Sequence, residues 1–330
     1  MDPSADLAIE TSRLTKTFGA IRAVDGVDLA VEAGTVFGFL GPNGAGKTTT
    51  IRILSTLTRP DSGTALVLGL DVVRQAEAVR GRIGLTGQYA SIDEDLTGRE
   101  NLVLLGRLLG YAWHRARSRA DELLAAFDLT DAAGRPVKTY SGGMRRRLDI
   151  AASVIVTPDL LFLDEPTTGL DPASRNQVWQ VVRALVDAGT TVLLTTQYLE
   201  EADRLADGVS VIDRGRVIAE GTPDELKKRL GGDRIEVVLD DPAALGAAAG
   251  IIGRIADGEV DVDAEALRIG APVSGRAAAL TEAVRALDGA GVAAADIGLR
   301  RPTLDEVFLH LTGEKKTGEK KTGEKEEVRS

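Results

Sequence analysis

The sequence lacks several features that define common classes of protein. It has no cysteine among its 330 residues, which excludes disulfide bonds and cysteine-ligated zinc sites and suits a reducing compartment. No stretch approaches the roughly 18 consecutive apolar residues of a membrane-spanning helix, and residues 1–6 hold no apolar signal core. Any passage across a membrane would therefore have to be formed by another chain.

Basic residues are also in the minority. The chain holds 40 lysines and arginines against 50 acidic residues, which gives a net charge of −10. Because nucleic-acid binding rests on neutralising phosphates, this balance argues against a protein that coats DNA or RNA, and we expect no nucleic-acid partner. The hydrophobic fraction of 43% and the charged fraction of 27% are those of a globular protein. The length leaves room for two domains, each with its own core.

One nine-residue segment, G-P-N-G-A-G-K-T-T, fits the pattern G-x-x-x-x-G-K-[ST] of loops that wrap nucleotide phosphates in backbone N–H groups. A buried strand is predicted before it, at 36–40, and a helix after it, at 49–54. The helix would direct its free N–H groups at the phosphates. We expect Lys47 to reach the β- and γ-phosphates and Thr48 to complete the shell of a Mg²⁺ ion. The predicted ATP-binding loop comprises Gly41, Pro42, Asn43, Gly44, Ala45, Gly46, Lys47, Thr48 and Thr49.

A second segment carries two acids at the end of an apolar run. Residues 160–163 are all apolar and are followed by Asp164 and Glu165. This is typical of a central parallel strand, and ligands in open α/β sheets lie at the carboxyl edge of such strands. We expect Asp164 to hold the Mg²⁺ shell and Glu165 to polarise an attacking water. The alternative is an acidic strand end that leads into a turn at Pro166, which is the minority interpretation beside a phosphate loop.

Three further segments are ambiguous when taken alone. Phe18 lies in a predicted turn and could stack on an adenine ring, although an ordinary aromatic packed on the sheet is the favoured interpretation. Ser-Gly-Gly at 141–143 opens a helix and could bind an anion, but a simple N-cap is favoured by the local sequence. The three arginines at 145–147 are predicted to form a solvated helix face.

The pattern of hydrophobic residues divides the chain. Short alternating runs over 7–32 predict an antiparallel sheet, and helical periodicity predicts a helical subdomain over about 89–157. We predict a first domain over 1–230, a small α+β domain over 231–312 and a disordered tail over 313–330, where a charged pentad repeats.

The second domain has a β-α-β-β-α-β order, as in ferredoxin-like folds. A capping box at Thr303 and Glu306 begins an amphipathic helix that ends near Leu311. We expect this helix to contact a second copy of the chain or a membrane permease. The predicted strands of the domain cover 234–239, 259–263, 266–270 and 294–300, and its helices cover 242–255 and 275–289.

The phosphate loop, the Ser-Gly-Gly segment and the Asp-Glu pair stand in an order that resembles the nucleotide-binding subunit of ABC transporters. The resemblance covers roughly residues 7–230. The stretches G-Q-Y-A-S-I-D at 87–93, T-Y-S-G-G-M-R-R-R-L-D-I at 139–150, T-T-Q-Y-L-E-E-A-D at 195–203 and R-P-T-L-D-E-V-F-L at 301–309 are similar to the daunorubicin/doxorubicin resistance ATP-binding proteins. The implied fold is an α/β P-loop NTPase of ABC type, with an antiparallel β subdomain, a parallel core sheet and a helical subdomain.

The same resemblance implies roles for single residues. Phe18 looks like the adenine-stacking aromatic, and Gln88 looks like the glutamine that couples Mg²⁺ to the helical subdomain. Asp171 looks like an aspartate at the dimer contact. The Ser141, Gly142 and Gly143 segment looks like the signature that caps the γ-phosphate bound to the partner subunit, while Asp164 and Glu165 look like the metal-shell acid and the catalytic base.

Two residues depart from the family pattern. Met144 stands where a glutamine is usual, which weakens one polar contact near the ribose. Gln197 stands where most members carry a catalytic histidine. Its amide can donate a hydrogen bond but cannot carry charge, and charge-assisted hydrogen bonds are about twice as strong. We therefore expect slower turnover from an active ATP hydrolase, since Glu165 is intact.

The implied function is that of an exporter ATPase. The resemblance implies a peripheral protein at the cytoplasmic side of the cell membrane, a homodimer with two composite ATP sites, and a separate integral membrane permease. The cargo would be an antibiotic or another hydrophobic drug, with self-resistance as the result. The alternatives are the ATPase of an importer, a soluble ABC-type ATPase and a regulatory nucleotide-binding module. The single cassette and the absence of cysteine disfavour the soluble ABC-type ATPase. The intact Glu165 disfavours the regulatory module.

Overall fold

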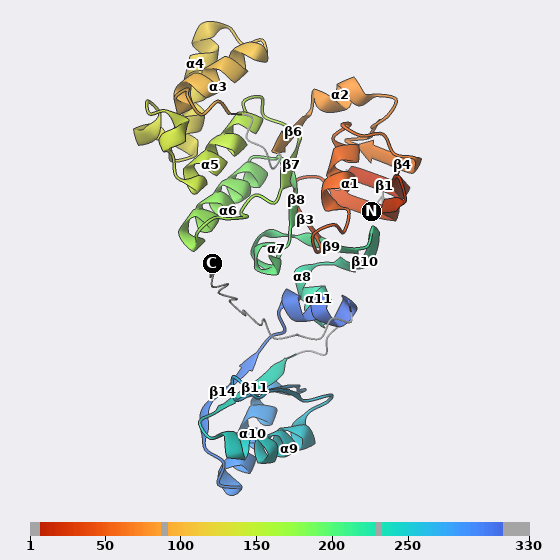
Figure 1. Ribbon diagram of the computed structural model, residues 1–330, viewed down its shortest axis with the longest axis vertical. Coiled ribbons are helices and arrows are strands. Elements are labelled where there is room, and N and C mark those ends of the chain that lie inside the picture. The colour runs from red at the N-terminus through yellow and green to blue at the C-terminus, as the bar shows by residue number, and fades with distance from the viewer. Residues whose placement is uncertain (1–6, 87–91, 229–232, 313–330) are drawn as a thin grey trace, which may run out of the picture. The chain divides into compact units, whose positions relative to one another are not determined.

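The computed structural model describes residues 7–86, 92–228 and 233–312 (Figure 1). The chain divides into two compact units, with the boundary between Leu226 and Lys227. Among the described residues, no helix combines the length and the hydropathy that a bilayer crossing requires.

An antiparallel sheet opens the first unit and consists of β1 (Leu7–Phe18), β2 (Ile21–Glu32), β4 (Ser62–Val67) and β5 (Leu70–Asp71), in the order β2-β1-β4-β5. Along β2, the buried Val27, Leu29 and Val31 alternate with exposed residues, which is the period of a sheet with one covered face. The hairpin between β1 and β2 turns at Gly19, whose φ of 58° is readily adopted by glycine. The antiparallel sheet predicted over 7–32 is confirmed.

The core sheet has the order β10-β9-β3-β8-β7-β6, and only its edge strand β10 is antiparallel to its neighbour. In β7, Leu160 and Phe162 pack into one hydrophobic cluster while Leu161 and Leu163 pack into the other. Because both faces are covered, the central strands are continuously apolar. The strands are β3 (Val36–Leu40), β6 (Ile83–Thr86), β7 (Leu160–Asp164), β8 (Thr191–Thr196), β9 (Gly208–Asp213) and β10 (Arg216–Gly221).

Helices cover both faces of this sheet. Figure 1 shows α5 (Gly142–Ser153) and α6 (Pro172–Asp187) on one side of β7 and β8, and α1 (Lys47–Leu54) with the antiparallel sheet on the other. The predicted α/β fold with a helical subdomain is confirmed, but no helix was predicted over 172–187. The remaining helices of this unit are α2 (Ala76–Arg80), α3 (Gly98–Leu108), α4 (Trp113–Ala126) and α7 (Leu199–Leu205), and α8 (Pro223–Lys228) crosses the unit boundary.

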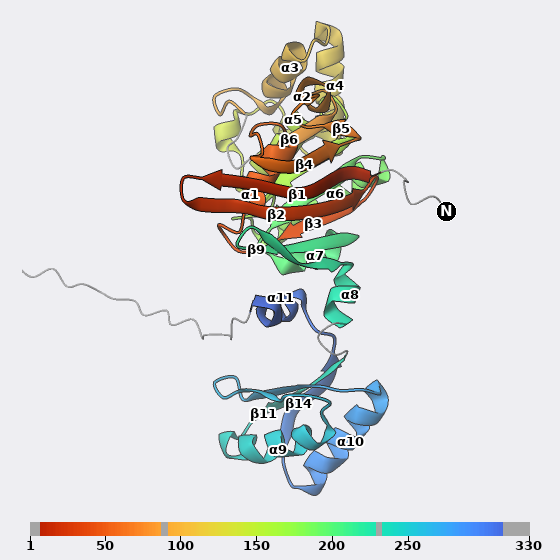
Figure 2. The same cartoon turned by 90° about the vertical axis from the view of Figure 1, so that its right-hand side faces the viewer.

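The second unit is a four-stranded antiparallel sheet in the order β12-β13-β11-β14. Two of its helices, α9 (Leu245–Ile255) and α10 (Arg276–Gly289), cover the same face of the sheet, as Figure 2 shows. The buried Ile235, Val237 and Leu239 of the central strand face them. The remaining elements are β11 (Arg234–Leu239), β12 (Asp261–Asp263), β13 (Arg268–Pro272), β14 (Ala294–Arg300) and α11 (Leu304–Thr312).

Three elements of this unit begin two or three residues later than predicted, namely α9 at Leu245, β12 at Asp261 and β13 at Arg268. The segment before α9 is a short 3-10 turn over Pro242–Ala244, with the Ala243 N–H bonded to Asp241. The turn before β13 is closed by the Ala266 N–H, which donates to Asp263 at 3.0 Å. In both places an aspartate side chain bonds the backbone a few residues ahead and delays the regular element.

Candidate nucleotide-binding site

The phosphate loop leaves β3 and enters α1 through two glycines that no other residue could replace without movement. A Cβ atom at Gly41 would collide with the Ile212 carbonyl oxygen, and one at Gly46 would collide with the Ala23 carbonyl oxygen. Gly46 also has a φ of 110°, and helix α1 begins at the next residue. The loop is therefore held tightly, with its following helix aimed at it.

Lys47 is the buried cation of this loop. Its side chain is 4% exposed, and its Nζ donates to the carbonyl oxygens of Gly41 at 2.7 Å and Pro42 at 3.1 Å. Nζ also lies 3.6 Å from Glu165 Oε1. Burial lowers the pKa of Lys47, while the charges of Glu165 and Asp164 act in the opposite direction. The loop, the lysine and both acids of the predicted site are thus brought together.

Asp164 lies directly opposite the first turn of α1. Its Oδ2 accepts a hydrogen bond from Thr48 Oγ1 at 3.0 Å, and its Oδ1 accepts one from Thr195 Oγ1 at 2.5 Å. Thr195 is the register partner of Asp164 on the neighbouring strand β8. The hydroxyl of Thr48 and the carboxylate of Asp164 form the kind of oxygen donor set that Mg²⁺ binds together with substrate phosphates and waters.

Glu165 is held in an uncommon backbone conformation. Its φ is 48°, in the left-handed region that costs a non-glycine residue about 1–3 kcal/mol. Its N–H donates to both the carbonyl oxygen and the hydroxyl of Thr195, each at 3.1 Å. Its Oε2 accepts from Thr168 Oγ1 at 3.2 Å, and its side chain is only 11% exposed. These contacts direct the carboxylate toward Lys47.

The Ser-Gly-Gly segment forms the N-terminus of α5. Ser141 is the N-cap, and its Oγ accepts from the Met144 N–H at 3.3 Å. Ser141 and Gly142 are exposed, whereas Gly143 is buried so closely against Ser174 of α6 that a Cβ atom would collide with it. Ser141 is therefore the N-cap of α5, and the exposed start of the helix is also open to a further partner.

The other predicted site residues lie at three different places. Phe18 ends β1 with its side chain 52% exposed, and Lys16 Nζ is 5.5 Å from the ring centroid. Gln197 follows β8 directly and is exposed, while Asp171 caps α6 by accepting from the Ser174 N–H at 3.0 Å. Gln88 lies outside the described residues.

The prediction for the arginine run is wrong. Arg147 is 6% exposed, and Arg146 donates to the main chain at the end of β7. Successive residues of a helix point about 100° apart, so three neighbours cannot share one face. Sequence reasoning also missed Thr195. Thr195 stands at the end of a short apolar run, and this position at a strand end is the one sequence feature that points to the carboxyl edge of the sheet.

The geometry agrees with comparison to known proteins. A family model described as ABC transporter matches residues 24–168. A daunorubicin resistance ATP-binding protein of Streptomyces coeruleorubidus is 61% identical, over 93% of this chain and 96% of that protein. The chain belongs to the ABC transporter family. A second relative is the Nod factor export ATP-binding protein I of Ralstonia nicotianae. It is 42% identical over 92% of both chains.

Solved structures support the same assignment. A nucleotide-free ATP-binding cassette from an ABC transporter matches with a TM-score of 0.62 and 25% identity, over 68% of this chain and 95% of that one. The chain is thus an ATP-binding subunit of the ABC type and hydrolyses ATP.

Proposed function

We propose that this subunit energises the export of an antibiotic or another hydrophobic drug through a separate membrane permease, and so gives resistance. The observation that carries the proposal is the 61% identity to a daunorubicin resistance ATP-binding protein over nearly the whole of both chains. The relative from Ralstonia nicotianae is named for export, which favours an exporter over an importer. The protein would then be peripheral, at the cytoplasmic side of the cell membrane.

The proposed ATP site is shared by two copies of the chain. One copy binds the phosphates through the loop at 41–49, with Phe18 stacked on the adenine. The other copy covers the γ-phosphate with Ser141, Gly142 and Gly143. This is supported by the exposed N-terminus of α5, which can receive an anion from outside the chain. Asp171 lies beside it, because its carboxylate bonds Ser174, the residue against which Gly143 packs.

In the proposed mechanism, Thr48 and Asp164 would hold Mg²⁺ together with Gln88. When bound, the ion would neutralise charge on the phosphates. Lys47 lies buried beside Glu165, and its side chain would shift from that contact to the incoming phosphates. The Glu165 carboxylate is then free to orient a water and accept its proton as the water attacks in line. Gln197 would donate its amide to the same region, and catalysis would rest on positioning and charge stabilisation.

The base assignment is tested with Glu165→Gln in the full-length protein. We expect an ATP-dependent dimer that hydrolyses ATP at least about 100-fold more slowly, because the amide cannot accept the proton. Glu200→Gln is a matched control, since Glu200 is an exposed acid of α7 paired with Arg204. Hydrolysis by Glu165→Gln at the rate of the control would show that another group is the base.

The export assignment is tested by measuring daunorubicin accumulation in cells. Cells that express the subunit with its permease should retain less drug than cells with the permease and a Lys47→Ala subunit. Equal accumulation in the two strains, with ATP hydrolysis intact in the unmodified protein, would exclude daunorubicin as the cargo. An importer is recognised by increased uptake and by a neighbouring gene for a solute-binding protein.

A further inference from the structure

The three consecutive arginines of α5 extend toward different parts of the first unit. Arg145 donates to Glu94 Oε1 at 2.9 Å, and Arg147 donates to the Phe127 carbonyl oxygen at 2.9 Å. Both of these contacts lie within the helical subdomain. Arg146 is the exception, since its guanidinium reaches out of that subdomain to the core sheet.

The contacts of Arg146 lie on either side of Glu165. Its Nε donates to the Pro166 carbonyl oxygen at 2.9 Å, and its Nη2 donates to the Asp164 carbonyl oxygen at 3.1 Å. Nη2 also lies 3.5 Å from Thr86 Oγ1, at the end of strand β6. A planar guanidinium with several donors in a fixed arrangement can hold two carbonyl groups at once. One side chain thus fixes the main chain before and after the proposed base.

The main chain at Glu165 requires such support. Its φ of 48° is unfavourable for a residue with a Cβ atom, and it persists only where the surroundings hold it. Thr195 of β8 binds the Glu165 N–H, whereas Arg146 binds the carbonyl groups on either side. The conformation that directs the carboxylate at Lys47 is therefore held by two different elements of the fold.

Arg146 remains a cation in this setting. Burial lowers the pKa of Arg146, while the negative charges of Asp149, Asp164 and Glu201 act in the opposite direction. Glu201 is itself 1% exposed and accepts from Trp179 Nε1 at 3.0 Å. Burial raises the pKa of Glu201, against the hydrogen bond from Trp179 and the charge of Arg146. The guanidinium is thus held among acids, and charge-assisted bonds to carbonyl groups are the strong ones.

We propose that Arg146 is a positioning residue for ATP hydrolysis, which holds Glu165 in its productive orientation from the helix that carries Ser141, Gly142 and Gly143. This inference rests on the proposed role of Glu165 as the base. Because Ser141 caps α5, a displacement of that helix by a second copy of the chain is transmitted to Glu165 through the Arg146 side chain. The segment that contacts the ATP bound to the partner is in this way linked to Glu165, which acts on the ATP bound to the same chain.

The test compares Arg146→Met with Arg145→Met in the full-length protein. The control removes an arginine from the same helix whose contacts stay within the helical subdomain. We expect Arg146→Met to lower kcat by about 10- to 100-fold, which is the effect of a small misplacement of a catalytic group. The KM for ATP and the affinity for a fluorescent ATP analogue should stay within about twofold, because the phosphate loop is unchanged. Arg145→Met should resemble the unmodified protein.

Two further variants separate positioning from general support of the fold. Arg146→Lys keeps the charge but has one ammonium group in place of a fork, so we expect it to regain little of the lost rate. In a Glu165→Gln background, Arg146→Met should lower the residual rate no further, because the residue through which it acts is already gone. A purely structural role would lower the rate in both backgrounds and would weaken binding of the analogue.

The outcomes distinguish this inference from the proposed function. If Arg146→Met keeps the normal kcat while Glu165→Gln is inactive, the role of Arg146 is refuted and the base assignment stands. If Glu165→Gln keeps normal hydrolysis, the proposed mechanism itself is wrong. Equal losses of kcat and of analogue binding in Arg146→Met, or a full rescue by Arg146→Lys, would also refute the positioning role.

Discussion

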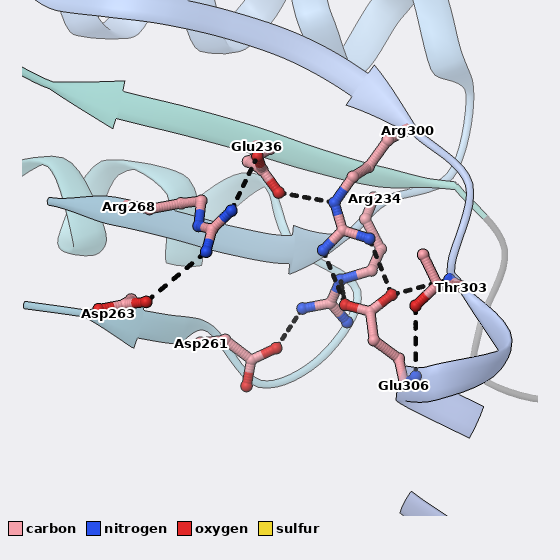
Figure 3. A network of polar contacts seen from close by, with 8 residues as sticks. All are labelled: Arg234, Glu236, Asp261, Asp263, Arg268, Arg300, Thr303 and Glu306. Carbon is pink, nitrogen blue, oxygen red and sulfur yellow. Dashed lines mark hydrogen bonds and ion pairs between the residues drawn. The ribbon is translucent and has the colours of Figure 1, made fainter. Parts of the chain in front are cut away.

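Replacement of Glu306 by glutamine is expected to loosen α11 from the sheet of the C-terminal unit. Figure 3 shows the network that the change would break, in which Arg300 of β14 reaches Glu306 of α11. Two parallel hydrogen bonds join them, at 2.8 and 2.7 Å. The Thr303 N–H donates to the same carboxylate at 3.0 Å, which completes a capping box, and Arg234 Nε lies 4.0 Å away. Arg300 also donates to Glu236 at 2.6 Å.

The size of the effect follows from the pKa of Glu306. Burial alone would raise this pKa above its ordinary value of 4.5, but bonding to Arg300 and Thr303 and the charges of Arg300 and Arg234 outweigh it and bring the pKa to about 2. A pKa that differs by one between the folded and the unfolded chain corresponds to about 1.4 kcal/mol of folding free energy. The difference of about 2.5 for Glu306 therefore corresponds to about 3 kcal/mol at neutral pH. Glutamine keeps the shape and one acceptor, so the expected loss is about 2–3 kcal/mol.

The stability that Glu306 contributes should decrease at low pH. The pKa of Glu306 is lower in the folded chain than in the unfolded chain. The stability that Glu306 contributes is therefore complete above about pH 4.5 and is lost as the pH falls toward 2. Hydrogen exchange of peptides from 233–300 measures the unit by itself, which matters because two units need not unfold together. Exchange should be about 30- to 100-fold faster in Glu306→Gln at pH 7, since about 1.4 kcal/mol corresponds to a factor of ten.

The control for this experiment is Glu282→Gln, which removes the same charge from an exposed position on α10. Its exchange should match that of the unmodified protein. Equal exchange in the Glu306 and Glu282 variants would refute the argument. Urea unfolding below pH 4.5 gives a second check, because the difference between Glu306→Gln and the unmodified protein should shrink there. A difference independent of pH would show that the charge is not its source.

Two further predictions concern the site and the C-terminal unit. Gln197→Ala should lower ATP hydrolysis by about 10- to 100-fold with ATP binding retained, because in the proposed mechanism the exposed amide beyond β8 would donate to the transition state. Unchanged turnover in a hydrolysis assay would mean that the residue is structural. A chain truncated after Gly232 should fail to co-purify with its permease, since α11 and the unit that holds it are lost. Recovery of the permease as efficient as with the full chain would refute this role.

Much of the fold could be predicted because its signals are local. The buried strand before the phosphate loop, the helix after it and the apolar run before Asp164 are contiguous patterns, and the structure places β3, α1 and β7 there. The α/β class with a helical insertion follows from the order of such segments. Helix α6 was missed because Asp171 was interpreted only as a residue of the dimer contact, although aspartate followed by proline is a typical helix start.

The candidate site itself was predictable only in part. The motifs alone show which residues can carry the chemistry, because a lysine, a threonine and two acids occur in them at fixed spacing. They do not show the partners of these residues. Thr48 meets Asp164 across 116 residues of chain, and Arg146 was assigned to solvent although it reaches the carbonyl groups beside Glu165. Hydrophobic periodicity places a residue on an element, but the partner of a buried polar group depends on which strands are neighbours and in which register. These partners depend on the folded arrangement, in which β7 lies between β6 and β8 and Arg146 of α5 reaches the carboxyl ends of β6 and β7.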